Sequence, residues 1–213
     1  MTKINLIMVI AVLFFVTACA SENHVQIPDG AVKEAKQTKP LDVGAEIPDV
    51  TVLTTDGETL NLKESVKQQK TVLIFYRGGW CPYCNAHLAK LQSIEKELKE
   101  NGYRILAISP DKPERLLETI VKKELGYTLL SDRDAKAAIA FGLAFYQNKT
   151  LREFMKPYGI DLYKASGQKH YLLPVPAAYV IGTDGYIKFA YYDTNYKNRI
   201  DPESLLKAAL MVQ

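Results

Sequence analysis

Two cysteines separated by two residues form the most reactive pattern in the chain. Cys81 and Cys84 stand in the stretch GGWCPYC, which follows the apolar run TVLIFY and precedes the periodic stretch NAHLAKLQSIEKELKENG. A CxxC pair can bind a metal, close a structural disulfide, or cycle between dithiol and disulfide. Each of these chemistries predicts different features elsewhere in the sequence.

Metal binding and structural crosslinking are both disfavoured. A structural zinc site requires four ligands, but the chain has no second CxxC and its histidines are His24, His87 and His170. A permanent disulfide between Cys81 and Cys84 stabilises weakly, because so short a ring removes little entropy from the unfolded chain. We therefore interpret the pair as redox-active and predict neither a metal site nor another cofactor.

The flanking sequence favours different roles for the two sulfurs. TVLIFY is typical of a strand buried on both faces, and residues 82–100 have helical spacing of apolar residues. Pro82 suits the first helical position, so the free amide groups and the positive helix end point at Cys81 and lower its pKa. Cys84, one turn later on the same face, is suited to resolve an oxidised Cys81.

The rest of the chain alternates between strand and helix patterns. Strands are predicted at 71–76, 104–109 and 127–132, helices at 82–100, 112–125, 133–143 and 201–212, and hairpins at 50–62 and 177–192. Asp56-Gly57 and Asp184-Gly185 supply the hairpin turns, and Asp201 precedes Pro202 as an N-cap. This order predicts an α/β fold, with a central mixed sheet flanked by helices.

Length and charge indicate one ordinary globular domain behind a leader. The chain has 213 residues, of which 47% are hydrophobic and 24% charged. The formal net charge of +3 is too small to indicate a nucleic-acid partner.

The N-terminus has the pattern of a bacterial lipoprotein signal. Lys3 precedes an apolar run over 4–16, which is shorter than the ~20 residues of a membrane-spanning helix. The following VTAC resembles a lipobox, in which Cys19 is acylated. We predict a signal peptide over 1–18, a lipidated Cys19 with a flexible tether over 19–42, and a redox domain over 43–213. The protein is then membrane-anchored outside the cytosol, facing the periplasm or the cell surface.

Several other residues are candidates for the site. Trp80 is expected to shield the cysteine pair, and His87 to face solvent. Pro176 precedes a predicted strand, a position compatible with a cis peptide bond. Residues 146–173 form a long insertion that fits no predicted element, and loops of this length are usually functional, so we expect it to cover part of the site.

Three stretches resemble a known family. FYRGGWCPYCNAHLAKL, SDRDAKAAIAFGL and LLPVPAAYVIGTDGYIKFAYYDTNYKNRIDPESLL are similar to peroxiredoxin-like members of the alkyl hydroperoxide reductase/thiol-specific antioxidant family. The resemblance runs from Val43 to the C-terminus and implies a thioredoxin-like fold. It also implies an antioxidant oxidoreductase that reduces hydroperoxides and is recycled by an external dithiol partner, such as a thioredoxin-like protein. In it Cys81 is the reactive cysteine, Cys84 its partner, and Pro176 a cis-proline packed against the pair.

One departure leaves the order of the two sulfurs open. Typical peroxiredoxins carry Thr or Ser three residues before the reactive cysteine, whereas Gly78 occupies that place before Cys81. Cys81 is itself three residues before Cys84, so the roles reverse if Cys84 takes the peroxidatic position. Arg77 and Arg199 are the candidate arginines for stabilising a thiolate and the leaving alkoxide.

Two other functions are compatible with the same residues. A membrane-tethered thiol–disulfide oxidoreductase acting on protein disulfides needs the same pair and the same fold. A copper-delivery protein using both cysteines and one histidine, His87 or His170, is a third candidate, because thiolates select Cu(I).

Overall fold

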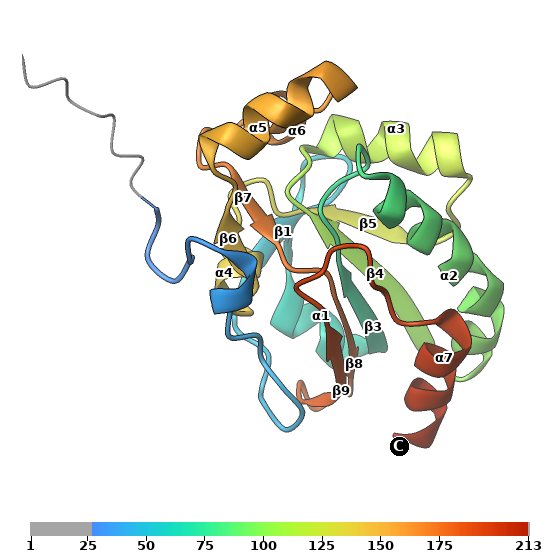
Figure 1. The fold of residues 1–213 in the computed structure, drawn as a ribbon. Coiled ribbons are helices and arrows are strands. Elements are labelled where there is room, and N and C mark those ends of the chain that lie inside the picture. Colours follow the sequence, from blue (N-terminus) through green and yellow to red (C-terminus); the bar gives the residue numbers. More distant parts are fainter. Residues whose placement is uncertain (1–26, 213) are drawn as a thin grey trace, which may run out of the picture.

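The structure, a computed structural model, describes residues 27–212. Its centre is a seven-stranded mixed sheet in the order β2-β1-β5-β4-β3-β8-β9 (Figure 1). β4 lies parallel to both β3 and β5, and the remaining neighbours are antiparallel. A second, two-stranded sheet pairs β6 with β7. The mixed sheet predicted from the sequence is confirmed.

The strands are β1 (Thr51–Leu53), β2 (Thr59–Asn61), β3 (Lys70–Phe75), β4 (Tyr103–Ser109), β5 (Thr128–Ser131), β6 (Ala144–Tyr146), β7 (Leu172–Pro174), β8 (Ala177–Ile181) and β9 (Ile187–Tyr192). The α-helices are α1 (Leu62–Gln68), α2 (Pro82–Glu100), α3 (Pro113–Lys123), α4 (Lys136–Ala140), α5 (Lys149–Met155), α6 (Leu162–Ser166) and α7 (Pro202–Met211). Two 3-10 turns are η1 (Ala35–Gln37) and η2 (Lys156–Tyr158).

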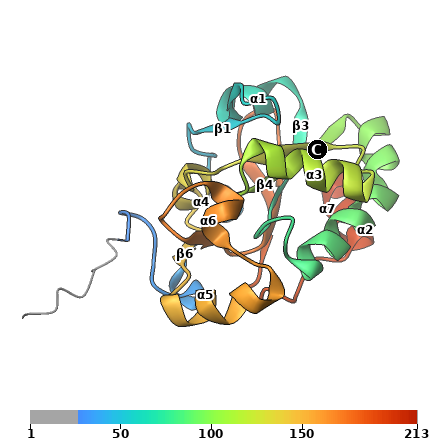
Figure 2. The ribbon, with the colours of Figure 1, turned by 90° about the horizontal axis from the view of Figure 1, so that it is seen from above.

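Helices cover both faces of the large sheet. On β3, Val72 and Ile74 face the cluster that contains apolar residues of α2, α3 and α7 (Figures 1 and 2). Leu73 and Phe75 point to the opposite face and pack with α1 and α4. Because side chains alternate along a strand, a strand covered on both sides must be apolar at every position, which explains the continuous run TVLIFY.

The element predictions were accurate for the long segments and less so for the short ones. Helix α2 and the β8–β9 hairpin occupy the predicted ranges, and Asp201 caps α7 by accepting from the Ser204 N–H at 3.1 Å. The helix predicted over 133–143 is only α4. Ala135 has a φ of 58° before it and Gly142 a φ of 68° after it, and neither conformation continues a right-handed helix.

The segment before Val43 is part of the fold, so the tether predicted over 19–42 is wrong for its described end. The Val32 N–H donates to the Ala144 carbonyl at 3.1 Å, and the Val32 carbonyl accepts from Tyr146 at 2.8 Å. Lys39 N–H donates to Gly142 at 3.1 Å. These bonds use backbone groups that the edge of β6 would otherwise leave unpaired. Cys19 and the predicted signal peptide lie outside the described residues.

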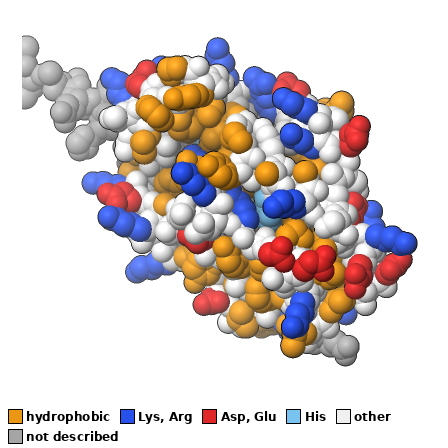
Figure 3. All heavy atoms as spheres, turned by 45° about the vertical axis from the view of Figure 1, so that its right-hand side comes forward, with side chains coloured by type: hydrophobic (Ala, Val, Ile, Leu, Met, Phe, Trp, Pro, Cys, Tyr) orange, Lys and Arg blue, Asp and Glu red, His pale blue; other side chains and the backbone are white. Residues whose placement is uncertain are grey.

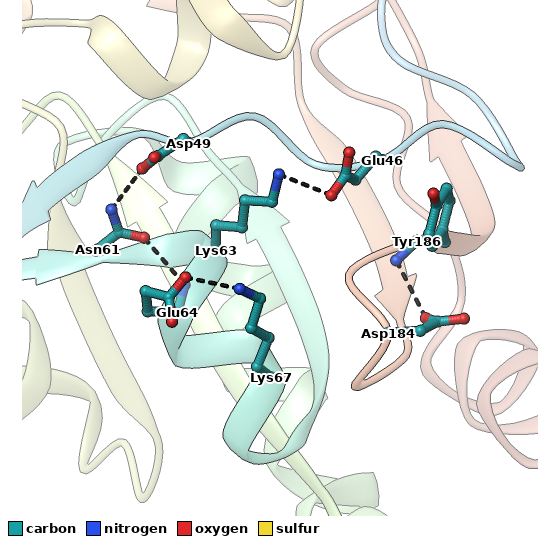
Figure 4. A network of polar contacts seen from close by, with 8 residues as sticks. All are labelled: Glu46, Asp49, Asn61, Lys63, Glu64, Lys67, Asp184 and Tyr186. Atoms are coloured by element: carbon teal, nitrogen blue, oxygen red, sulfur yellow. Dashed lines mark hydrogen bonds and ion pairs between the residues drawn. The ribbon is translucent and has the colours of Figure 1, made fainter.

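A group of surface contacts ties the following segment to α1 and the β1–β2 hairpin (Figure 4). Glu46 forms an ion pair with Lys63 of α1 at 2.7 Å, and Asp49 accepts from Asn61 at 2.5 Å. Their exposure means that water screens them, so they guide the path of the chain more than they stabilise it. Between residues 27 and 212, no helix is both long and apolar enough to cross a bilayer.

Candidate active site

Cys81 lies where the sequence predicted, between a buried strand and a helix. It is the N-cap of α2, with φ −90° and ψ 116°, and Pro82 occupies the first turn. The Cys81 carbonyl accepts the Asn85 N–H at 3.0 Å, and the Cys81 N–H donates to Gly78 at 3.1 Å. Proline suits this place because the first turn needs no amide donor. The sulfur therefore sits at the positive end of the 19-residue α2.

Both sulfurs are free thiols and both are buried, but their acidities differ. Hydrogen bonding from the Cys84 thiol lowers the pKa of Cys81 to about 6, against burial and with help from the Cys84 amide and the charges of Arg77 and Arg199. Burial raises the pKa of Cys84 well above its usual range, and the neighbouring Cys81 adds to this. Near neutral pH the pair therefore holds one thiolate, on Cys81, and one thiol, on Cys84.

The two predicted arginines converge on the pair from different segments. Arg77 is buried, and its guanidinium carbon lies 4.3 Å from the centre of the Tyr196 ring and 5.2 Å from that of Trp80. Arg199 Nη2 lies 3.3 Å from Cys84 Sγ. Arg199 Nη1 is fixed by the carbonyls of Tyr196 and Asn198. Stacking and backbone contacts thus hold both cations in place beside the sulfurs.

A cavity of about 450 Å³ opens onto Cys81. Trp80, Cys81 and Pro176 line it together with Tyr196. The insertion at 146–173 supplies much of the remaining wall through β6, α5 and the turn after it. Its contributing side chains include Tyr146, Leu151, Phe154, Met155, Tyr158 and Ile160. This segment therefore borders the cavity next to Cys81, and that it covers part of a catalytic site stays a prediction.

The rim of this cavity carries exposed apolar side chains. Leu151, Phe154 and Tyr158 expose 46%, 65% and 71% of their surface. Hydrophobic side chains also gather over the end of the molecule that carries α5 (Figure 3). Isolated exposed apolar residues are ordinary, but a cluster beside a cavity indicates a surface that contacts apolar matter.

Pro176 lines the cavity, but it is not a cis-proline. No peptide bond within residues 27–212 is cis, so that expectation is wrong. Pro176 joins β7 to β8 in an extended run, in which Val175 N–H donates to Leu143 at 2.9 Å and the Pro176 carbonyl accepts from Asp193 at 3.3 Å. With this bond trans, the chain passes from the two-stranded sheet at β7 into the seven-stranded sheet at β8.

Neither His87 nor His170, the histidines of the described part of the chain, completes a metal site. His87 is buried with 6% exposure, so the expectation that it faces solvent is wrong. Burial lowers the pKa of His87 to about 4, and the charge of Arg199 adds to this, so the ring is neutral. His170 is held by the Arg133 carbonyl and the Leu172 N–H. No group of three His, Cys, Asp or Glu residues between 27 and 212 is placed to hold a metal ion.

Sequence reasoning missed two polar residues beside the pair. Asp111 Oδ2 accepts the Gly79 N–H at 2.6 Å, and Asn85 Nδ2 donates to the Gly79 carbonyl at 2.7 Å. Asp111 follows the end of β4, which lies parallel to β3. Because parallel neighbours end at the same sheet edge, the acidic residue after RILAIS was a signal that placed it next to GGWC.

The fold is a mixed sheet with helices on both faces, and a CxxC pair begins the helix that follows a central strand. These features define a thiol-dependent redox protein of thioredoxin-like fold. The chain belongs to the AhpC/TSA family, whose profile matches residues 43–190.

Among its curated relatives are the putative peroxiredoxin bcp of Haemophilus influenzae and peroxiredoxin Bcp of Escherichia coli K12. Each is 36% identical over 104 residues, which cover 49% of this chain and 66% of the relative. The putative peroxiredoxin bcp of Helicobacter pylori strain 26695 is 26% identical over 162 residues, covering 74% of this chain and 91% of that protein.

Solved structures share the fold. Peroxidoxin BcpB from Mycobacterium tuberculosis superposes with a TM-score of 0.62 at 17% identity, covering 81% of this chain and 99% of that one. Reduced Prx3 from Vibrio vulnificus gives 0.65 at 18% identity, with 80% and 99% covered. Likeness at such identities concerns the fold, and the function is argued from the site.

Proposed function

We propose that the protein is a thiol peroxidase that reduces hydroperoxides through Cys81 and Cys84. The observation that carries the proposal is the pairing of a Cys81 thiolate, which has a pKa of about 6 and lines the cavity, with a buried Cys84 thiol. A thiolate is the nucleophilic form of cysteine, and a second thiol within reach can resolve its oxidation product. Membership of the AhpC/TSA family supports the same activity.

In the first step the Cys81 thiolate attacks one oxygen of the hydroperoxide. The sulfur–oxygen bond forms as the oxygen–oxygen bond breaks, and the leaving alkoxide or hydroxide takes a proton to become an alcohol or water. Cys81 is oxidised to a sulfenic acid, and the peroxide is reduced by two electrons. Arg77 and Arg199 favour the thiolate and the developing negative charge on the leaving oxygen.

In the second step Cys84 attacks the Cys81 sulfenic sulfur. The sulfur–oxygen bond breaks, the hydroxide leaves with the Cys84 proton as water, and a disulfide forms. Arg199, 3.3 Å from Cys84 Sγ, offsets part of the penalty for charging this buried sulfur. An external dithiol partner of the thioredoxin type then reduces the disulfide by two exchange steps and is itself oxidised.

The cavity favours organic hydroperoxides over hydrogen peroxide alone. Its volume of about 450 Å³ exceeds what a peroxide group needs, and aromatic and aliphatic side chains from 146–173 line it. Burial of a substrate's apolar part there contributes roughly 25 cal/mol for each Å² removed from water. A small peroxide gains nothing from this term.

The test is stopped-flow fluorescence of Trp80, which is the single tryptophan and lines the cavity with Cys81. Reduced wild-type protein is mixed with hydrogen peroxide or cumene hydroperoxide, in parallel with Cys81→Ser and Cys84→Ser. We expect fast oxidation in the wild type, a sulfenic acid that accumulates in Cys84→Ser and reacts with dimedone, and no reaction in Cys81→Ser.

Other outcomes favour other assignments. A sulfenic acid that forms only in Cys81→Ser assigns the first attack to Cys84 and makes Cys81 the resolving sulfur. A wild-type rate equal to that of a free thiol, together with rapid reduction of a protein disulfide, contradicts the peroxidase and supports the thiol–disulfide oxidoreductase. The copper-delivery alternative gains no support from the placement of His87 and His170.

We also propose that the enzyme works outside the cytosol, anchored through acylated Cys19. The support comes from the sequence alone, namely the signal-like pattern over 1–18, since the structure does not describe those residues. Radioactive palmitate should label the wild type in a bacterial host and leave Cys19→Ser unlabelled. Equal labelling of both proteins contradicts the anchor and leaves the peroxidase assignment intact.

A further inference from the structure

The backbone of Gly79 is held at both of its polar groups, by the buried Asp111 and by the half-buried Asn85. Asp111 Oδ2 accepts its N–H at 2.6 Å, and Asn85 Nδ2 donates to its carbonyl at 2.7 Å. Asp111 comes from the end of β4 and Asn85 from the first turn of α2, so the two bonds join a strand and a helix across the loop. Gly79 precedes Cys81 by two residues, and no step of the proposed mechanism uses either bond.

The loop has no room for other residues at this place. A Cβ on Gly79 would fall 2.1 Å from Thr119 Oγ1. Gly78 has a φ of 140°, and a Cβ there would fall 2.3 Å from Trp80 Nε1 and 2.8 Å from Asp111 Oδ1. The Gly78-Gly79 pair therefore lets the backbone approach Asp111 closely. Close packing on every side makes the path of the loop depend on these contacts.

A buried carboxylate is a costly means of holding one amide. Asp111 is 2% exposed, and burial raises its pKa to about 7 while the Gly79 N–H acts in the opposite direction. An apolar residue would fill the space without that desolvation cost. What the carboxylate adds is a short, directional bond to the loop that ends in Cys81.

The loop also sets the position of the reacting sulfur. Cys81 N–H donates to the Gly78 carbonyl at 3.1 Å, and the Cys81 carbonyl accepts from Asn85 N–H at 3.0 Å. Asn85 thus bonds to both Gly79 and Cys81. A change in the backbone angles at Gly79 would move the N-cap, and with it Cys81 Sγ relative to the Cys84 groups that stabilise its thiolate.

We propose that Asp111 and Asn85 are positioning residues that clamp the Gly79 backbone, one through its N–H and the other through its carbonyl, and thereby hold Cys81 Sγ in its reactive place. The expected effect of this clamp on turnover rests on the proposed peroxidase function. Its expected effect on the Cys81 thiolate does not depend on any substrate. The clamp gives a structural reason for the two glycines that precede the cysteine pair.

The experiment compares Asp111→Ala, Asn85→Ala, Asp111→Asn and the double alanine variant with the wild type. Asp132→Asn is the matched control, because Asp132 is also a buried carboxylate, 4% exposed, but it holds amides of α4. Each reduced protein is assayed for its rate with peroxide, for its rate of alkylation by iodoacetamide, and for the Cys81 pKa from thiolate ultraviolet absorbance.

We expect each single alanine variant to lose about tenfold in peroxide rate, as small misplacements of reacting groups do, and to raise the Cys81 pKa. Because the two bonds hold successive peptide groups of one short loop, the double variant should lose less than the product of the two single-variant factors. Asp111→Asn keeps an acceptor oxygen and should retain most of the rate. Asp132→Asn should change the melting temperature without changing the Cys81 pKa.

Wild-type rate and wild-type Cys81 pKa in folded Asp111→Ala and Asn85→Ala overturn the clamp. Equal losses in Asp132→Asn overturn it too, because they reduce it to general destabilisation. If Asp111→Ala does not fold, Asn85→Ala decides by the same readouts. If wild-type Cys81 does not react with peroxide, the proposed function fails, and alkylation and the Cys81 pKa still decide on the clamp.

Discussion

Arg199 Nη2 lies 3.3 Å from Cys84 Sγ, whereas the cavity is lined by Cys81 and Arg77 and by neither Cys84 nor Arg199. The cation therefore contacts the sulfur with the raised pKa, while the thiolate forms on its neighbour. Such a contact has its largest effect when negative charge appears on Cys84, and the mechanism proposed above produces that charge as Cys84 attacks the sulfenic sulfur. Under that proposal the two steps are divided between two cations, with Arg77 lining the cavity together with Cys81.

The first prediction follows from this division. Arg199→Ala should slow disulfide formation by about tenfold or more, because a hydrogen bond to a charged group is worth roughly 1.5–3 kcal/mol. Oxidation of Cys81 by peroxide should slow less. Two-phase Trp80 fluorescence after one equivalent of peroxide separates the steps, and Lys207→Ala, an exposed residue of α7, is the control. A larger effect on the first phase than on the second would assign the first attack to Cys84.

The second prediction concerns pH. The pKa of Cys81 is lowered to about 6, so the peroxide rate should be nearly constant above about pH 7 and fall about tenfold for each pH unit well below 6. Arg77→Met removes a positive charge that lowers this pKa, so its profile should move to higher pH. The ratio of the two rates should be largest below about pH 6 and smallest near pH 9. Profiles of the same shape and midpoint would exclude an effect of Arg77 on the Cys81 pKa.

The positions of residues that depend only on their neighbours in the chain were predictable from the sequence. The position of Cys81 at the start of α2 follows from an apolar strand, a proline and a helical pattern in direct succession. Arg77 lies in the same short stretch. Its contact with Tyr196 joins residues more than 100 positions apart in the chain, so that contact was not predictable.

Features that depend on packing between distant segments of the chain were not predictable from the sequence. The polarity of residues 31–41 resembles a tether, yet their backbone pairs with β6 and with the loop at Gly142, which no local pattern reports. His87 has the sequence position of a surface residue, and the approach of the segment at Arg199 and Ile200 buries it. The bond at Pro176 was predicted from the superfamily, and the extended path from β7 to β8 makes it trans.

The third prediction tests the cavity. Leu151→Asp places a charge in the apolar wall. It should lower the rate with cumene hydroperoxide about tenfold relative to the rate with hydrogen peroxide, which is the factor expected when a substrate loses an apolar contact in its pocket. Leu117→Asp is a matched control, because Leu117 is similarly exposed at 44% but lies on α3 outside the cavity lining. The ratio of the two rate constants is the measurement. An unchanged ratio in Leu151→Asp contradicts organic substrates entering by this wall.

The fourth prediction concerns Asp132, whose two oxygens accept the Ala137 and Ala138 amides at 2.9 and 2.8 Å. Burial raises the pKa of Asp132 to about 7 despite these bonds. Since the folded pKa exceeds the unfolded one, the folded state binds the proton more tightly. Its contribution to stability is therefore present below about pH 4 and is lost as pH rises towards 7.

Asp132→Asn should remove this pH dependence, because an amide does not titrate. The free energy of unfolding of the wild type, relative to that of Asp132→Asn, should fall between about pH 4 and pH 7 and level off above it. Urea denaturation at several pH values measures the difference. A difference that grows in favour of the wild type as pH rises would mean that the carboxylate is stabilised in its ionised form.

The last prediction tests whether the segment before Val43 belongs to the domain. Gly142 has a φ of 68°, and a Cβ there would fall 2.0 Å from the Lys39 carbonyl oxygen, so Gly142→Ala must displace this segment. Gly44→Ala is the matched control, because Gly44 has a φ of 87° and nothing within 4 Å of the added Cβ. Both variants carry the backbone strain of a left-handed alanine, and only the first adds a clash.

Hydrogen exchange should therefore report faster exchange of the Val32, Lys39 and Leu41 amides in Gly142→Ala than in Gly44→Ala. Because Lys33 and Glu34 also line the cavity beside Cys81, the displacement should reach the substrate side of the site. The rate with cumene hydroperoxide should then change in Gly142→Ala and not in Gly44→Ala. Rapid exchange of these amides already in the wild type would restore the tether predicted from the sequence and separate the N-terminal segment from the function of the cavity.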